Sequence, residues 1–279
     1  MARSWQKFPY PAGAFDYSGE SLADAWDRLH RGDREPFPSA EYLDEMNDQY
    51  GVVSDDPGAV SEALQEAWRC YHRGDFADAV DQGLALGPVG YFVANKAQGI
   101  YAANLEEDET AQLKLFQEVA ERAEEAQGAM PKHANSFYFQ AFALGRYSQG
   151  ISITKALSQG LGGKIKTALE RALELEPDHA DAHTAMGLYH AEIIDKVGKM
   201  VGKLTYGASA DKALGHFKKS TSLFPESPIV QMEYANGLLL LKGDDGYEEA
   251  SELYVAASEA EPMDAMEKLD VEAAKAELE

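Results

Sequence analysis

Apolar residues recur along most of this chain at the three- and four-residue spacing of amphipathic helices. Short strings rich in Gly, Pro, Asp and Glu separate these stretches and predict turns. We therefore expect an all-α protein. The predicted helices are 21–30, 39–48, 59–72, 76–86, 89–105, 110–127, 133–147, 164–174 and 263–279, with a further pair of helices within each of 179–225 and 228–262.

Two of these segments share one spacing: a small residue, an aromatic residue four positions later, a small residue three later and a proline five later. This spacing is typical of the second helix of a tetratricopeptide repeat, a unit of two antiparallel helices that stacks into arrays. The predicted fold is accordingly an antiparallel helix-pair repeat array. The residues that carry the pattern are Ala213, Phe217, Ser220 and Pro225; Ala250, Tyr254, Ala257 and Pro262; and the related turn Gly74, Asp75, Phe76 and Ala79.

A narrower resemblance covers roughly the last hundred residues. There the chain resembles the T-component proteins of TRAP transporters and the regulator-of-microtubule-dynamics proteins. The resemblance implies stacked helix pairs with a concave face or channel that takes a peptide, a helix or a small apolar ligand. The residues that carry it are Tyr206, Gly207 and Ala208; Ala213, Leu214 and Phe217; Pro225; and Glu233, Tyr234 and Ala235.

The predicted repeats are longer than the standard unit. The helix-terminating prolines 88, 131, 177, 225 and 262 follow one another at intervals of 37 to 48 residues, against about 34 in a tetratricopeptide repeat. The excess lies in two glycine-bearing extensions, 150–163 and 191–209. Long connections in compact domains are usually functional, so these extensions either form a pocket or only pack against the repeats.

The first 56 residues differ from the rest in being rich in Pro, Gly, Asp and aromatic residues. We expect this N-terminal segment, 1–56, to form short helices that pack on the repeat domain, 57–279.

The charge balance narrows the choice of partners. Lys and Arg number 25 against 48 Asp and Glu, a formal net charge of -23, which repels phosphate backbones and excludes nucleic acid as an expected partner. The sequence has no apolar stretch long enough for a signal peptide or a membrane span, so we expect a cytoplasmic protein. The single cysteine, Cys70, falls in a helical run and is predicted to be a small buried residue.

The stretch from Ala191 to Gly207 is apolar on one side and carries three lysines on an otherwise acidic chain. Three interpretations are open: a long helix packed inward, the wall of a groove for a protein or ligand, or a contact with a membrane surface. The residues predicted to line the binding groove are Tyr189, Lys196, Lys199, Lys203 and Tyr206, and secondarily Arg146, Tyr147 and Gln149.

Histidines gather near the start of the same region. His183 and His190, with His179, Asp181 and Glu192 nearby, include residue types that bind metals. The repeat frame instead assigns His183 and His190 to inward-packing positions on either side of Gly187, so we expect structural histidines and no metal or cofactor.

The function expected from the sequence is therefore a non-enzymatic scaffold that binds a protein or peptide partner in a concave groove. Two alternatives remain open: a carrier of a small apolar ligand, and a metal-dependent enzyme that uses the His183 and His190 region.

Overall fold

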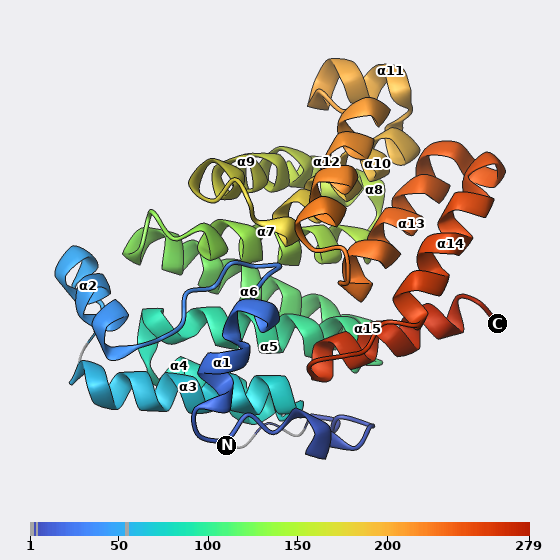
Figure 1. Ribbon diagram of the computed structural model, residues 1–279. Helices are drawn as coiled ribbons and strands as arrows, with labels where there is room; N and C mark the ends of the chain where they lie inside the picture. Colours follow the sequence, from blue (N-terminus) through green and yellow to red (C-terminus); the bar gives the residue numbers. More distant parts are fainter. Residues whose placement is uncertain (1–2, 4, 54–55) are drawn as a thin grey trace. The chain divides into compact units, whose positions relative to one another are not determined.

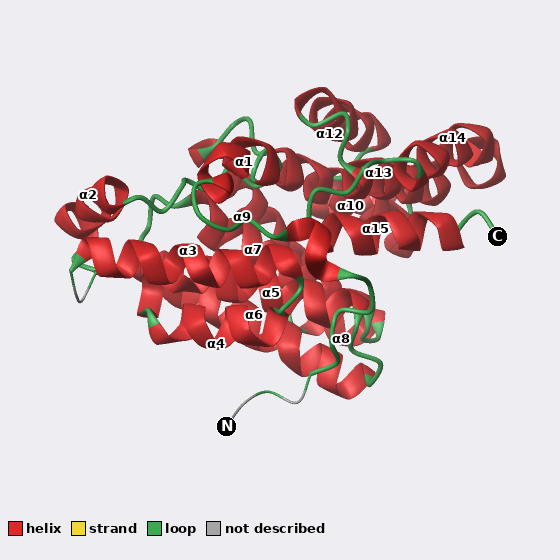
Figure 2. Ribbon diagram, turned by 60° about the horizontal axis from the view of Figure 1, so that its bottom comes forward, coloured by secondary structure: helices red, strands yellow, loops and turns green. Residues whose placement is uncertain are grey.

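The computed structural model describes residues 3, 5–53 and 56–279. These residues form helices joined by turns and loops, with no strand among them (Figure 2). This confirms the all-α helical repeat array. Five residues of the predicted N-terminal segment, 1, 2, 4, 54 and 55, lie outside the described part of the chain.

The described chain divides into two compact units. The first takes in the chain up to His30, Glu35–Gly150 and Asp264–Met266. In it the helices from α3 to α7 pack in succession, each on the one before it. Its elements, of which Figure 1 labels the α-helices, are the 3₁₀ turn η1 (Ala12–Phe15), α1 (Ser21–Leu29), α2 (Ala40–Tyr50), α3 (Pro57–Arg73), α4 (Phe76–Ala85), the 3₁₀ turn η2 (Gly87–Gly90), α5 (Tyr91–Asn104), α6 (Glu109–Ala129) and α7 (Ala134–Gln149).

The second unit takes in Arg31–Arg34, Ile151–Met263 and Glu267–Glu279. Here α10 packs against α9, α12 and α13, and α13 packs against α14. Its elements are α8 (Ile153–Ser158), α9 (Leu161–Leu175), α10 (Ala180–Val197), α11 (Lys199–Val201), the π-helical turn η3 (Gly202–Tyr206), α12 (Ala210–Leu223), α13 (Pro228–Lys242), the 3₁₀ turn η4 (Gly243–Gly246), α14 (Tyr247–Ser258) and most of α15 (Ala265–Ala276).

Local sequence signals set the ends of these helices. Asp56, Asp108 and Ser209 each accept a hydrogen bond from a backbone N–H in the first turn of α3, α6 and α12, which satisfies a donor that the helix itself leaves unpaired. Gly74 ends α3 in the left-handed region, with φ of 91°, a conformation that glycine adopts without a steric penalty. These short turns let consecutive helices run antiparallel.

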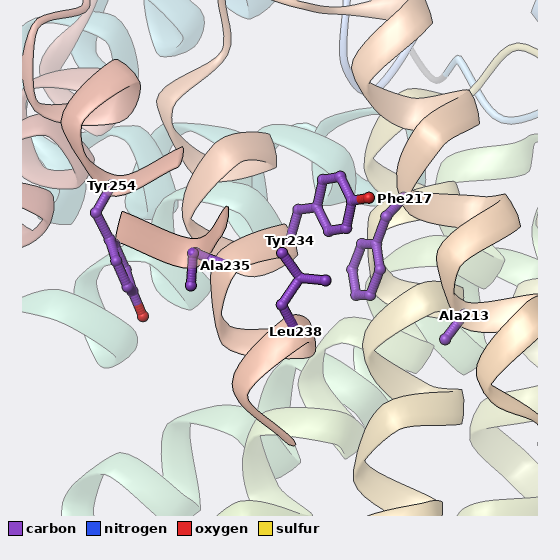
Figure 3. Packing of buried hydrophobic residues seen from close by; sticks show 7 residues of the cluster. Ala213, Phe217, Tyr234, Ala235, Leu238 and Tyr254 are labelled. Carbon is purple, nitrogen blue, oxygen red and sulfur yellow. The ribbon is translucent and has the colours of Figure 1, made fainter. Parts of the chain in front are cut away.

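The core of the second unit is built around one aromatic ring. Phe217 is fully buried and stacks on Tyr234 with ring centroids 5.0 Å apart (Figure 3). The backbone of α10 approaches the ring closely at Gly187, and that of α13 approaches it closely at Gly237. A Cβ added at either position would overlap atoms of the ring. The small and aromatic residues of the repeat pattern thus hold three helices together.

The N-terminal segment makes specific contacts inside the first unit. The Ser61 hydroxyl of α3 donates to the Pro38 carbonyl at 2.6 Å, and the Arg69 guanidinium donates to the Tyr17 carbonyl at 2.8 Å. Trp5 stacks on Tyr101 of α5 with ring centroids 4.1 Å apart. Main-chain carbonyls of this segment are therefore paired with side chains of the helices that follow.

Of the three interpretations of the stretch from Ala191 to Gly207, the long inward-packed helix is wrong. Residues 191–207 do not form a long inward-packed helix, because Gly198, with φ of 81° and ψ of 157°, ends α10 and turns the chain outward. None of the helices in the described part of the chain is both long and apolar enough to cross a membrane.

Candidate functional site

The chain between Gly198 and Gly207 forms a short protrusion, the 198–207 segment, composed of α11 and η3. In Figure 1, α11 lies beyond the ends of α10 and α12. Gly198 and Gly207 both have positive φ, 81° and 66°, so glycines mark the two ends of the protrusion. Ser209 then caps α12 and returns the chain to the helix array.

The base of the 198–207 segment is anchored to α10. Gly202 is buried, and a Cβ added to it would lie 3.3 Å from a methyl carbon of Ile193. The Ala208 N–H donates to the Gly202 carbonyl at 3.1 Å, and the Ala208 side chain is buried. These contacts pack the base of the protrusion against α10.

The tip of the segment exposes apolar side chains. Leu204 is 81% exposed, Met200 76% and Val201 49%. Exposing this much apolar surface at one place costs free energy that burial against a partner would recover, and such patches mark interaction sites.

The lysines of the 198–207 segment flank this apolar tip. Lys199 and Lys203 are exposed and have no carboxylate within 4.0 Å among the described residues. Lys196, at the end of α10, instead pairs with Glu192 at 3.1 Å. The segment therefore presents two unpaired positive charges beside the exposed apolar side chains, on a chain whose net charge is -23.

Two tyrosines of the predicted groove are wholly or partly buried: Tyr189 of α10, and Tyr206 at the end of the 198–207 segment itself. The Tyr206 ring packs on Gly162 of α9, and a Cβ added to this glycine would lie 3.0 Å from the ring. Tyr189 of α10 is buried, and its hydroxyl has no hydrogen-bond partner among the described residues. Burial raises the pKa of the Tyr189 phenol, and the nearby Tyr206 and Glu170 add to this effect. The hydroxyl of Tyr189 thus stays a neutral donor at physiological pH.

The secondary set of predicted residues belongs to the other unit, at the end of α7. Arg146 donates to the Gln149 side chain at 3.4 Å, and its guanidinium lies 5.9 Å from the centre of the Phe142 ring. Tyr147 is only 4% exposed. The structure thus brings Tyr189, Lys196, Lys199, Lys203 and Tyr206 into one region and places Arg146, Tyr147 and Gln149 in a separate compact unit.

The histidines on α10 meet a third histidine that sequence reasoning missed, His216 of α12. The Nδ1 atoms of His183 and His216 are 2.9 Å apart, and His183 Nε2 lies 3.0 Å from the Pro177 carbonyl. Since a carbonyl only accepts, His183 Nε2 carries a proton and donates to it. In its neutral form His183 then accepts at Nδ1 from the Nδ1–H of His216. His216 directly precedes Phe217 in the repeat pattern, and this position could have indicated that His216 lies against α10.

The environment keeps these imidazoles neutral. Burial lowers the pKa of His190 to about 4, with the charges of His216, Lys212 and Lys166 adding to the effect. Burial and the neighbouring His183 and Lys212 likewise lower the pKa of His216 to about 4. No group of three or more His, Cys, Asp or Glu side chains in the described chain has an arrangement that could hold a metal ion. His179 instead caps α10 by accepting from the Ala182 N–H at 3.1 Å.

Comparison with known proteins finds a family model and a similar solved structure. Residues 92–279 match the model of the family described as regulator of microtubule dynamics protein 1-3. A solved structure described as TTC0263, a thermophilic TPR protein in Thermus thermophilus, superposes with a TM-score of 0.55 at 16% identity, over 78% of this chain and 99% of that one. At that identity the likeness shows the fold alone. No curated protein matches the chain. The predicted resemblances to tetratricopeptide repeat proteins and to regulator-of-microtubule-dynamics proteins are confirmed.

Proposed function

Because this chain belongs to the regulator of microtubule dynamics protein 1-3 family and has the fold of a tetratricopeptide repeat protein, we propose that it is a non-enzymatic scaffold that binds a protein partner through the 198–207 segment. Helix-pair arrays suit this task because their rigid elements present side chains with little ordering cost on binding. The observation that carries the proposal is the anchored, apolar and basic tip of the segment.

The chemistry of the tip indicates what the partner presents. Met200, Val201 and Leu204 favour an apolar surface, and Lys199 and Lys203 favour carboxylates around it. An amphipathic peptide or helix with Asp or Glu beside its apolar face meets both requirements. Elsewhere the net negative charge of the chain repels such a peptide, so the local positive charge also directs it to this site.

Peptide display against the immobilised full chain tests this proposal. We expect the selected peptides to combine apolar and acidic residues, and to bind the variant Met200→Glu/Leu204→Glu about a hundredfold or more weakly. Burying a Met or Leu side chain contributes roughly 1.5–3 kcal/mol, so losing two such contacts removes at least about 3 kcal/mol. Lys199→Glu should weaken binding less, and more so at low salt.

The matched control is Val255→Glu, which adds a carboxylate at another exposed apolar position, 41% exposed on α14. It should leave peptide affinity within about twofold of the wild-type value. Selected peptides that bind the Met200→Glu/Leu204→Glu variant as tightly as the wild type would refute the assignment of the partner site to the 198–207 segment.

A further inference from the structure

A second exposed surface of the same compact unit lies on α14. Tyr247 is 68% exposed and Val255 is 41% exposed. With Ser251 between them at four-residue spacing, they lie along one side of the helix. The fold does not use this side, because α14 packs into the core of the second unit through Ala250 and Tyr254. The exposed side of α14 is called the α14 face below.

Carboxylates border the α14 face. Glu248 and Glu252 are exposed and lie four positions apart, each one position away from the apolar row. Neither has a Lys, Arg or His nitrogen within 4.0 Å in the described chain, whereas the neighbouring Glu249 pairs with Lys242 at 2.6 Å. The α14 face is therefore an amphipathic helix surface with acidic groups beside apolar ones, which is the chemistry that the 198–207 segment requires of a partner.

The 198–207 segment complements the α14 face in charge and in spacing. Its exposed Met200 and Leu204 are flanked by Lys199 and Lys203, which are also four positions apart, and it contains no acidic residue. Opposite charges at matching spacing favour association and set its register. Within one copy α14 packs on α13 and η4, and the exposure of both surfaces shows that neither covers the other there. The two surfaces can therefore meet between two copies.

We propose that a second copy of this chain is a partner of the 198–207 segment. Its α14 face docks on the segment, with Tyr247 and Val255 against the exposed apolar side chains and Glu248 and Glu252 against the lysines. This inference rests on the proposed function, because it names the partner of the same site.

The association should be weak for two reasons. The two surfaces are small, and small interfaces belong to transient complexes, so we expect a dissociation constant on the order of 100 μM. Both copies also carry a net charge of -23. Salt at about 0.15 M screens the long-range repulsion that this charge causes, while the contact itself is short-range.

Sedimentation equilibrium of the full chain, from about 5 μM to about 1 mM in about 0.15 M salt, tests the proposal. We expect the average mass to rise with concentration. The tip variant Met200→Glu/Leu204→Glu and the α14 variant Tyr247→Glu/Val255→Glu should each weaken self-association at least about tenfold. The matched control Ile153→Glu/Leu157→Glu changes two apolar residues of α8 that are 47% and 49% exposed, and it should associate like the wild type.

Mixing the two variants tests whether these surfaces dock on each other. The tip variant keeps an intact α14 face, and the α14 variant keeps an intact 198–207 segment. The mixture should therefore form a one-to-one complex within about threefold of the wild-type affinity, although neither variant self-associates. Lys199→Glu/Lys203→Glu should pair with Glu248→Lys/Glu252→Lys in the same way, because the charges are exchanged across the contact.

The proposal is overturned by a mass that stays monomeric up to about 1 mM, by a loss in the α8 control equal to that in the α14 variant, or by a mixture that stays monomeric. These results would leave the proposed function standing, because binding of display-selected peptides is measured at concentrations too low for self-association. The α14 variant separates the two claims, since it should lose self-association and keep the wild-type affinity for those peptides. Peptide binding that is unaffected in the tip variant would instead refute the proposed function.

Discussion

Substituting alanine for Gly187 tests the packing that holds the second unit together. A Cβ at Gly187 would lie 2.7 Å and 2.8 Å from the Cε1 and Cδ1 atoms of Phe217, well inside van der Waals contact. The ring cannot retreat easily, because Gly237 approaches its other edge and Tyr234 stacks on it with centroids 5.0 Å apart. Overpacking of this kind costs about 1–3 kcal/mol. The higher helix propensity of alanine returns about 1 kcal/mol, so the unfolding free energy should fall by up to about 2 kcal/mol.

Gly215 on α12 provides the matched control, because a Cβ there meets no atom within 4 Å and the position is exposed. Gly215→Ala should raise the unfolding free energy by about 0.5–1 kcal/mol through helix propensity alone. Urea denaturation followed by circular dichroism measures both variants.

A double variant separates crowding of the ring from other effects of the substitution. Adding Phe217→Leu to Gly187→Ala should cost less than Phe217→Leu alone costs in the wild type, since the smaller side chain makes room for the new methyl group. Equal unfolding free energies for Gly187→Ala and Gly215→Ala would show that α10 does not approach the Phe217 ring as closely as the structure indicates.

Three further results are expected. His190 and His216 have pKa values of about 4 in the folded chain and about 6.5 when unfolded, so the unfolded state binds more protons between these values. The stability that the neutral imidazoles contribute is full above pH 6.5 and falls by roughly 3 kcal/mol per histidine as the pH drops to 4. Urea denaturation across this range should show a smaller fall for His190→Asn. His72→Ala should lower the unfolding free energy by about 3 kcal/mol or more in thermal or urea denaturation, because it removes the imidazole whose Nδ1 lies 2.9 Å from the Asp264 carboxylate in a buried pair, the Asp264 side chain being only 2% exposed. Cys70 is buried and burial raises the pKa of its thiol, so a thiol reagent such as DTNB should label it rapidly in urea and hardly at all in the native protein; rapid native labelling would contradict its placement.

Much of the fold was predictable because the signals are local. Apolar periodicity, capping residues and the small-aromatic spacing around Phe217 lie within a turn or two of the helices that they define. These signals placed the helix ends to within a few residues. For example, a helix is predicted at 110–127, and α6 spans Glu109–Ala129 in the structure. The division of the chain near residue 150 was not readable, because it depends on which helices pack together in three dimensions.

The candidate site was predictable only in part. Periodicity indicated an amphipathic stretch at 191–207, but it could not show that Gly198 takes a positive φ and turns the apolar residues outward. The reverse happened at Tyr189, which is buried although the sequence suggested a groove residue. Helical spacing fixes which residues share a face, whereas exposure depends on which neighbouring helix covers that face. His216 was missed for the same reason, since its contact with His183 joins two helices.

Hydrogen–deuterium exchange of the full chain, measured with and without a display-selected peptide, tests most directly whether the 198–207 segment is the partner-binding surface. We expect slower exchange in α11, η3 and the end of α10 when the peptide is bound, and unchanged exchange in the first unit and in α14. Protection elsewhere, with residues 198–207 exchanging at the same rate with and without peptide, would show that the partner binds at another surface.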